Sequence, residues 1–377
     1  MMKKIIALAL AAVMLVPLLS GCSASLKKRE AVGKLNIPNP NYNSIQSLGY
    51  GIDSAIGDTV IYTKDGFYNA ITTLVADGKK YKLLTGTDPR LVSKGQIYSG
   101  DLVVLGDKGY FTAYSEIEKN TPEEMGTFPH ESYFYEYDLE NDEFKEIYKS
   151  DYVYEWAVSD DFLVYTISNY GMDDDYVCSL YVYSFGTDEA LLVCDDAEAF
   201  SVVNGNVRYI TYEECFSLCE YDPESAEEVC LGVFEIDPEA VEYDYAWYNF
   251  TEDRVIINSI NIDSRSFYIY STVEGTIDEY TVPCNIVDLR AGEDYAYIHC
   301  EKSYYDEPNE DDGIYRLDFS DMTVEKLDIE LEQYVYMFVG PDDSLYLEMY
   351  GDAVFTNSVY SVYDENEGKL RDLFKSW

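Results

Sequence analysis

Hydrophobic residues recur at every second position in many short runs along this chain, and polar turns separate the runs. Residues 313–330, GIYRLDFSDMTVEKLDIE, show the pattern: the run IYRLDF meets the turn SDMT, and the run VEKLDI follows. Alternation on both sides of a polar turn predicts a β-hairpin. A single hairpin is marginally stable in water, so the number of similar hairpins decides the fold.

The same design occurs seven times. Hairpins are predicted at residues 71–85, 133–149, 180–195, 217–233, 267–282, 314–329 and 359–374. A more continuously apolar run precedes each hairpin, as is typical of strands that are covered on both faces. Before that run comes a tight turn rich in Asp, Glu or Asn, and before the turn lies a fourth predicted strand. The turn carboxylates are expected to cap nearby backbone N–H groups.

The repeating unit is therefore four strands long. Its acidic turns start at residues 57, 106, 159, 204, 251, 292 and 341, and this spacing is typical of propeller blades. One such sheet has two apolar faces, and seven sheets around an axis cover each other. The sequence predicts an all-β fold, a seven-bladed β-propeller of four-stranded blades over residues 44–377. Trp156, Trp247, Leu289 and Phe338 are assigned to equivalent places, with the tryptophans as wedges between blades.

The front of the chain is typical of an export signal. MMKK is basic, IIALALAAVMLVPLL is apolar, and LSGC follows at Leu19–Cys22. The last four residues resemble the lipobox of bacterial lipoproteins. That resemblance implies cleavage of a signal peptide at residues 1–21 and a lipid on Cys22. An ordinary secretory signal with a chance cysteine is the alternative.

Residues 22–43 are predicted to be a flexible tether. Lys27, Lys28 and Arg29 would lie beside the bilayer, where anionic lipids attract each cation by about 1 kcal/mol. Prolines and asparagines follow. Residues 34–38 offer an extra strand for closing the ring, because the chain otherwise ends on an outer strand. We expect a lipid-anchored protein on the extracytoplasmic face of the cell membrane.

The recurrent DD or ED turn before an aromatic-rich strand resembles TolB-type propellers. It is more similar still to uncharacterised propeller lipoproteins of Gram-positive bacteria, which implies a location at the cell surface. The resemblance spans about residues 45–375, but the repeats are degenerate. It therefore bears on the fold and carries little information on activity.

Charge narrows the range of partners. The chain has 72 Asp and Glu against 26 Lys and Arg, a formal net charge of −46. Such a surface repels nucleic acid, so no nucleic-acid partner is expected. Solubility in an exposed compartment explains the charge, with cation binding as the alternative. No cofactor is expected. Asp173–Asp175 and Glu307–Asp312 do not match an EF-hand loop, so no metal site is predicted.

Seven of the eight cysteines remain once Cys22 is lipidated, and an odd number cannot all pair within one chain. Most lie in or beside predicted strands, where a thiol behaves as a small apolar group. A disulfide between Cys178 and Cys215 is the alternative. Their spacing predicts no zinc site.

Candidate chemistry lies on the long loops between the second and third strands of four blades, at residues 115–132, 168–177, 301–313 and 351–357. All four are expected on one face. The candidate ligand-binding residues there are Phe128, His130, Tyr170, Met172, Asp173, Tyr304 and Tyr305. Aromatic rings beside carboxylates suit a peptide, a basic partner or a sugar. Solvated insertions without function are the alternative.

No catalytic motif occurs: the chain has no GxSxG, no HExxH and no phosphate-binding glycine loop. His299 is expected near the core with its nitrogens satisfied, and His130 is expected to be exposed. We therefore predict a non-catalytic ligand- or protein-binding module. The alternatives are a carbohydrate-active enzyme that uses paired Asp and Glu at the channel mouth, or a scaffold subunit of an envelope complex.

Overall fold

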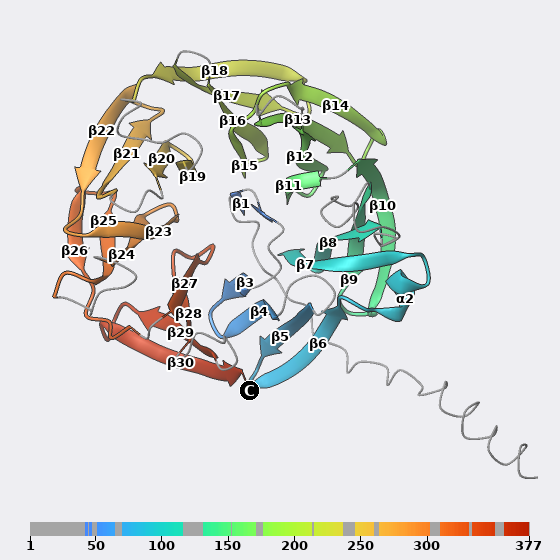
Figure 1. The fold of residues 1–377 in the computed structure, drawn as a ribbon, viewed down its shortest axis with the longest axis horizontal. Helices are drawn as coiled ribbons and strands as arrows, with labels where there is room; N and C mark the ends of the chain where they lie inside the picture. Colours follow the sequence, from blue (N-terminus) through green and yellow to red (C-terminus); the bar gives the residue numbers. More distant parts are fainter. Residues whose placement is uncertain are drawn as a thin grey trace, which may run out of the picture.

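Seven antiparallel sheets stand around a central axis in the computed structural model (Figure 1). The structure describes residues 42–43, 45–46, 51–64, 70–115, 131–151, 153–170, 176–212, 215–236, 246–259, 264–301, 310–331, 334–350 and 358–376. Each sheet contains four strands that are consecutive in the chain. The predicted all-β, seven-bladed β-propeller is confirmed.

The blades follow one another along the chain. Blade 1 is β3 (Gly51–Ile56), β4 (Thr59–Lys64), β5 (Ile71–Ala76) and β6 (Lys79–Thr85). Blade 2 is β7 (Gln96–Leu105), β8 (Lys108–Ser115), β9 (Glu131–Asp138) and β10 (Glu143–Asp151). Blade 3 is β11 (Val153–Val158), β12 (Phe162–Tyr170), β13 (Tyr176–Ser184) and β14 (Glu189–Cys194). A one-turn helix, α2 (Pro89–Val92), connects blades 1 and 2.

The second half repeats the same order. Blade 4 is β15 (Ala199–Val203), β16 (Asn206–Tyr212), β17 (Phe216–Asp222) and β18 (Glu227–Phe234). Blade 5 is β19 (Ala246–Phe250), β20 (Arg254–Ser259), β21 (Ser266–Ser271) and β22 (Thr276–Thr281). Blade 6 is β23 (Asn285–Ala291), β24 (Tyr295–Glu301), β25 (Gly313–Asp318) and β26 (Thr323–Lys326). Blade 7 is β27 (Tyr334–Val339), β28 (Leu345–Tyr350), β29 (Ser358–Asp364) and β30 (Lys369–Ser376).

Two faces follow from this topology. The turn face carries the tight turns between the first and second strands, at 57–58, 106–107, 159–161, 204–205, 251–253, 292–294 and 340–344. The loop face is the opposite one, where the second strand of each blade ends and the third begins. Because all seven blades share one strand order, the four long loops predicted as ligand-binding leave from strand ends on the loop face.

Turn carboxylates cap backbone N–H groups, as predicted. Asp138 ends β9, and its Oδ1 accepts hydrogen bonds from the N–H groups of Glu140 at 3.0 Å and Asn141 at 2.9 Å. On the turn face the caps also join neighbouring blades. Asp343 of blade 7 accepts the Glu293 N–H of blade 6 at 2.7 Å. Carboxylates therefore stabilise both the hairpins and the ring.

The core consists of apolar layers between neighbouring blades. Trp156 is fully buried and lies edge-on to Phe134 of blade 2, with ring centroids 5.9 Å apart. The predicted equivalence of the four wedge residues is wrong for Trp247 and Phe338. Trp156 pairs with Tyr165, and the matching positions in blades 5 and 7 are Tyr248, which pairs with Ile257, and Met337, which pairs with Leu347. Trp247 is shifted by one residue, so it is half-buried and carries the Arg290 guanidinium over its ring.

No strand is exchanged across the ring closure within the described residues, because blades 1 and 7 each use four consecutive strands. Residues 34–38, offered as an extra strand, lie outside the described residues. Side chains close the ring at the seam between blades 7 and 1, which we call the closing seam. There, Tyr62 packs on Tyr360 at 4.7 Å and on Phe374 at 5.3 Å between ring centroids.

A short N-terminal segment occupies the middle of the ring. β1 (Tyr42–Asn43) pairs with β15, the inner strand of blade 4. β2 (Ile45–Gln46) pairs with β11, the inner strand of blade 3. Figure 1 shows β1 at the centre, inside the circle of blades. The last two residues of the predicted tether therefore form part of the sheet of blade 4.

Candidate functional site

The predicted ligand-binding residues fall almost wholly on undescribed loops. Phe128, His130, Met172, Asp173, Tyr304 and Tyr305 lie outside the described residues. Tyr170 is the last residue of β12, where its backbone pairs with Tyr176. The strands that flank the loops of blades 2 and 3 are described, and a pocket lies between these two blades.

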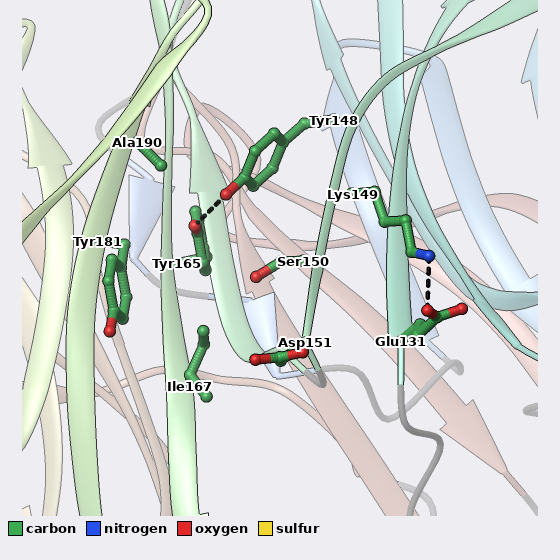
Figure 2. A pocket seen from close by; sticks show the side chains of 9 residues that line it. All are labelled: Glu131, Tyr148, Lys149, Ser150, Asp151, Tyr165, Ile167, Tyr181 and Ala190. Carbon is green, nitrogen blue, oxygen red and sulfur yellow. Dashed lines mark hydrogen bonds and ion pairs between the residues drawn. The ribbon is translucent and has the colours of Figure 1, made fainter.

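The pocket has a volume of about 500 Å³. Its walls come from blade 2 on one side and blade 3 on the other (Figure 2). The lining residues are Glu131, Tyr148, Lys149, Ser150, Asp151, Tyr165, Ile167, Tyr181 and Ala190. Glu131 begins β9 and Asp151 ends β10, so this rim lies at the loop face. β8 and β12 also end at the loop face.

Tyrosines form the floor of the pocket. The hydroxyls of Tyr148 and Tyr165 lie 2.8 Å apart and share a hydrogen bond across the blade boundary. Tyr165 is 1% exposed, and this burial, followed by the hydrogen bond to Tyr148, raises the pKa of its phenol. Tyr165 also stacks on Tyr181 with centroids 5.5 Å apart. These phenols therefore line the pocket with aromatic rings and with hydroxyl groups.

One charge pair lies at the rim. Lys149 Nζ contacts Glu131 Oε1 at 2.5 Å, and the Tyr133 hydroxyl donates to Glu131 Oε2 at 2.5 Å. The hydrogen bond to Glu131 raises the pKa of Lys149. Figure 2 shows Lys149 and Glu131 together, apart from the tyrosine cluster. This carboxylate is thus already neutralised by a cation.

Asp151 differs from Glu131. It is exposed, and no cation of the described residues pairs with it. Ser150 lies beside it, and both side chains appear on the same side of the hollow in Figure 2. The pocket thus combines aromatic surface, hydroxyl groups and one carboxylate that no cation of the described residues neutralises. That combination suits an ammonium or guanidinium group, which an aromatic face and a carboxylate both attract.

Sequence reasoning did not identify the tyrosines of this pocket. Tyr148 and Tyr181 belong to predicted hairpins and Tyr165 to a predicted second strand, so all three were assigned to structure. The available signal was the tyrosine count, 39 of 377 residues. That density also serves the core, so it does not single out this seam.

Two buried polar groups lie away from the pocket. Glu348 on β28 is fully buried, and its Oε1 accepts hydrogen bonds from the hydroxyls of Tyr350 and Tyr360. Burial raises the pKa of Glu348, against the opposing effect of these hydrogen bonds. His299 on β24 is 2% exposed, as predicted for a residue near the core. Its Nε2 lies 3.2 Å from Glu301 Oε1, but neither ring nitrogen makes a well-aligned hydrogen bond with a described residue, so the expected satisfaction is wrong.

The described residues contain neither a candidate metal site nor a membrane-spanning helix. No cluster of three His, Cys, Asp or Glu side chains in the described part of the chain is arranged to hold a metal ion. No described helix combines the length and hydropathy needed to cross a bilayer. Cys284 and Cys300 are buried thiols, and burial raises the pKa of Cys284 to about 11.

Known structures share the fold. An acylaminoacyl peptidase from Pyrococcus horikoshii has a TM-score of 0.53 and 12% identity over 89% of this chain and 52% of its own. A puromycin-hydrolyzing peptidase from Mycobacterium tuberculosis has a TM-score of 0.52 and 7% identity over 90% of this chain and 56% of its own. This chain spans about half of each peptidase, and at these identities the similarity shows the fold alone.

TolB from Acinetobacter baumannii also matches, with a TM-score of 0.38 and 11% identity over 77% of this chain and 71% of its own. That score is too low to support a conclusion about a closer relationship. No protein-family model and no curated protein matches the sequence.

Proposed function

We propose that this protein is a lipid-anchored, extracytoplasmic propeller that binds a cationic peptide in the pocket between blades 2 and 3 and on the loops beside it. The observation that carries the proposal is the pocket itself, with three tyrosines and the carboxylate of Asp151, which pairs with no cation of the described residues. The role is binding without catalysis.

The overall charge supports a basic partner. A surface with a formal charge of −46 attracts cations over a long range and accelerates their association. At the pocket, the cationic groups of the peptide would then contact the aromatic rings. A neutral glycan would profit from the rings and hydroxyls but not from the charge. We therefore favour the peptide over the glycan.

Binding can be measured by calorimetry with a lysine-rich pentapeptide and, in parallel, with a neutral oligosaccharide. We expect the peptide to bind, and Asp151→Asn to weaken binding about tenfold, which corresponds to about 1.4 kcal/mol. Tyr181→Ala should weaken it further by removing ring contact. Asp278→Asn, an exposed carboxylate on β22 of blade 5, is the matched control and should bind as the wild type does.

Equal loss in the Asp151 and Asp278 variants would show that only net charge matters, and the pocket assignment would fail. Binding of the oligosaccharide with no binding of the peptide would replace the proposed ligand class. No observation among the described residues favours the carbohydrate-active enzyme or the envelope scaffold, so both stay predictions.

The lipid anchor is tested separately. Wild-type protein from cells grown with a labelled fatty acid should carry the label and fractionate with membranes, and Cys22→Ala should lose both properties. Label or membrane association that persists in the variant would contradict the anchor without affecting the pocket.

A further inference from the structure

The direction of the N-terminal segment is fixed by its strand pairing. Tyr42 pairs with Val202 and Asn43 with Ser201, so β1 runs antiparallel to β15. Ile45 pairs with Trp156 and Gln46 with Glu155, so β2 runs antiparallel to β11. The segment therefore runs in the opposite direction to both inner strands.

The inner strands define the direction of the segment relative to the two faces of the ring. β11 and β15 end at the tight turns 159–161 and 204–205, which belong to the turn face. A segment antiparallel to them enters the channel at the turn face and proceeds towards the loop face. The next strand, β3, is itself an inner strand that begins at the loop face, where the segment ends, and it runs back towards the turn face.

The pairing also holds the segment in place. Each inner strand presents an open backbone edge to the channel, and an added strand satisfies hydrogen-bonding groups on that edge. β1 and β2 do this for two adjacent blades, and β1 also contacts β19 of blade 5. The segment is thus attached to three of the seven blades.

We propose that the chain is threaded through its own propeller, so that the turn face lies towards the membrane and the loop face, with the pocket, is presented outward. This inference rests on the proposed lipid on Cys22. Twenty residues separate Cys22 from Tyr42, and they span at most about 70 Å. This stretch therefore joins the ring at the turn face, where β1 enters the channel.

The charge on the turn face makes the threading necessary for orientation. The exposed acids of its tight turns are Asp58, Asp107, Asp160, Asp161, Glu252, Glu293, Asp294 and Asp342. An anionic bilayer repels such a face over roughly the Debye length of about 8 Å. A tether that leaves the ring at this face would hold it near the membrane against that repulsion.

The test uses the full-length lipidated protein in vesicles of phosphatidylglycerol and phosphatidylcholine in equal parts, with energy-acceptor lipids at the surface. A fluorescent non-natural residue replaces Asp58 on the turn face or Asp151 on the loop face. The two faces are about 20 Å apart, the length of a six-residue strand. We expect about twofold or more energy transfer from position 58 than from position 151.

Equal or reversed transfer in vesicle-bound protein would overturn the threading. Protein that does not bind vesicles at all would instead overturn the lipid anchor, so the two failures are distinguishable. The double variant Asn43→Pro with Gln46→Pro removes one backbone N–H group from each of β1 and β2 and should reduce the difference between sites while vesicle binding persists. Ala31→Pro in the predicted tether is the matched control and should keep the difference.

Discussion

The closing seam and the seam between blades 2 and 3 are built from the same residue type and differ in what they leave between the blades. In the closing seam, Tyr360 and Phe374 stack at 4.5 Å between centroids, and the Tyr360 hydroxyl is held by the buried Glu348. In the other seam, Tyr148 and Tyr183 stack at 4.1 Å, but the Tyr148 hydroxyl meets another tyrosine.

This difference determines which of the two seams is fully packed and which contains a pocket. A buried carboxylate accepts several hydroxyls at once and draws Tyr350 and Tyr360 together. Two phenols can satisfy each other only in part, and space for a guest remains beside them. Side-chain packing thus fills the closing seam, where no strand is exchanged among the described residues. The seam between blades 2 and 3 contains the pocket for the proposed ligand.

The largest expected effect is at the closing seam. Tyr360→Ala removes a fully buried ring and a hydrogen bond to Glu348, so we expect the free energy of unfolding to fall by about 3–5 kcal/mol. Urea unfolding followed by circular dichroism measures it. Tyr181→Ala, a half-buried ring at the pocket, should cost less than half as much. Equal losses would mean that the two seams contribute alike.

The next effect depends on pH. The folded-state pKa of Glu348 is raised by burial above the usual 4.5, so its contribution to stability is present below that value and is lost as pH rises through the raised pKa. Relative to Glu348→Gln, the wild type should therefore lose stability as pH rises from 4.5 through the raised pKa. Urea midpoints of both proteins across this range test the sign, and parallel curves would contradict it.

A smaller effect is expected at the pocket. Tyr148→Phe removes the hydrogen bond between the Tyr148 and Tyr165 hydroxyls, and we expect a loss of about 1 kcal/mol, the usual net value of a hydrogen bond. Thermal unfolding measures the loss. Tyr181→Phe removes the hydroxyl of a stacked, half-buried ring in the same pocket, and it should stay within about 0.5 kcal/mol of the wild type. A reversed order would show that the shared hydrogen bond does not order the floor.

The smallest effect is on the surface of the closing seam. Arg371 pairs with Asp58 at 2.8 Å, with both side chains about half-exposed or more. Arg371→Ala should change stability by no more than about 0.5 kcal/mol, and added salt should abolish the change. A double-mutant cycle with Asp58→Ala isolates the pair. A coupling above 1 kcal/mol would assign the surface a larger share in ring closure than we expect.

The fold could be predicted because each blade repeats the same local physics. Alternation, turn residues and continuous apolar second strands recur in every blade. A pattern that is ambiguous in one blade can therefore be interpreted from the others. Register was less secure. Trp247 is displaced by one residue from the place assigned to it, because three residues separate it from its tight turn and only two separate Trp156 from its own.

The pocket could not be predicted because it depends on how two blades meet. Tyr148 and Tyr165 are far from unusual in strands, and nothing in the local pattern shows that a hollow lies beside them. Likewise, Asp151 is one of 72 acidic residues. Its distinction is that it lines the pocket with no cation partner among the described residues, and its place in the pocket is a property of the assembled ring.

The pairing of Tyr42 with Val202 also has a consequence for the order in which the protein folds. These residues are 160 positions apart, so the earliest-synthesised strand has no partner until two of the middle blades exist. Contacts of such long sequence separation slow folding. We expect the ring to assemble around an unpaired N-terminal end, whose docking completes folding.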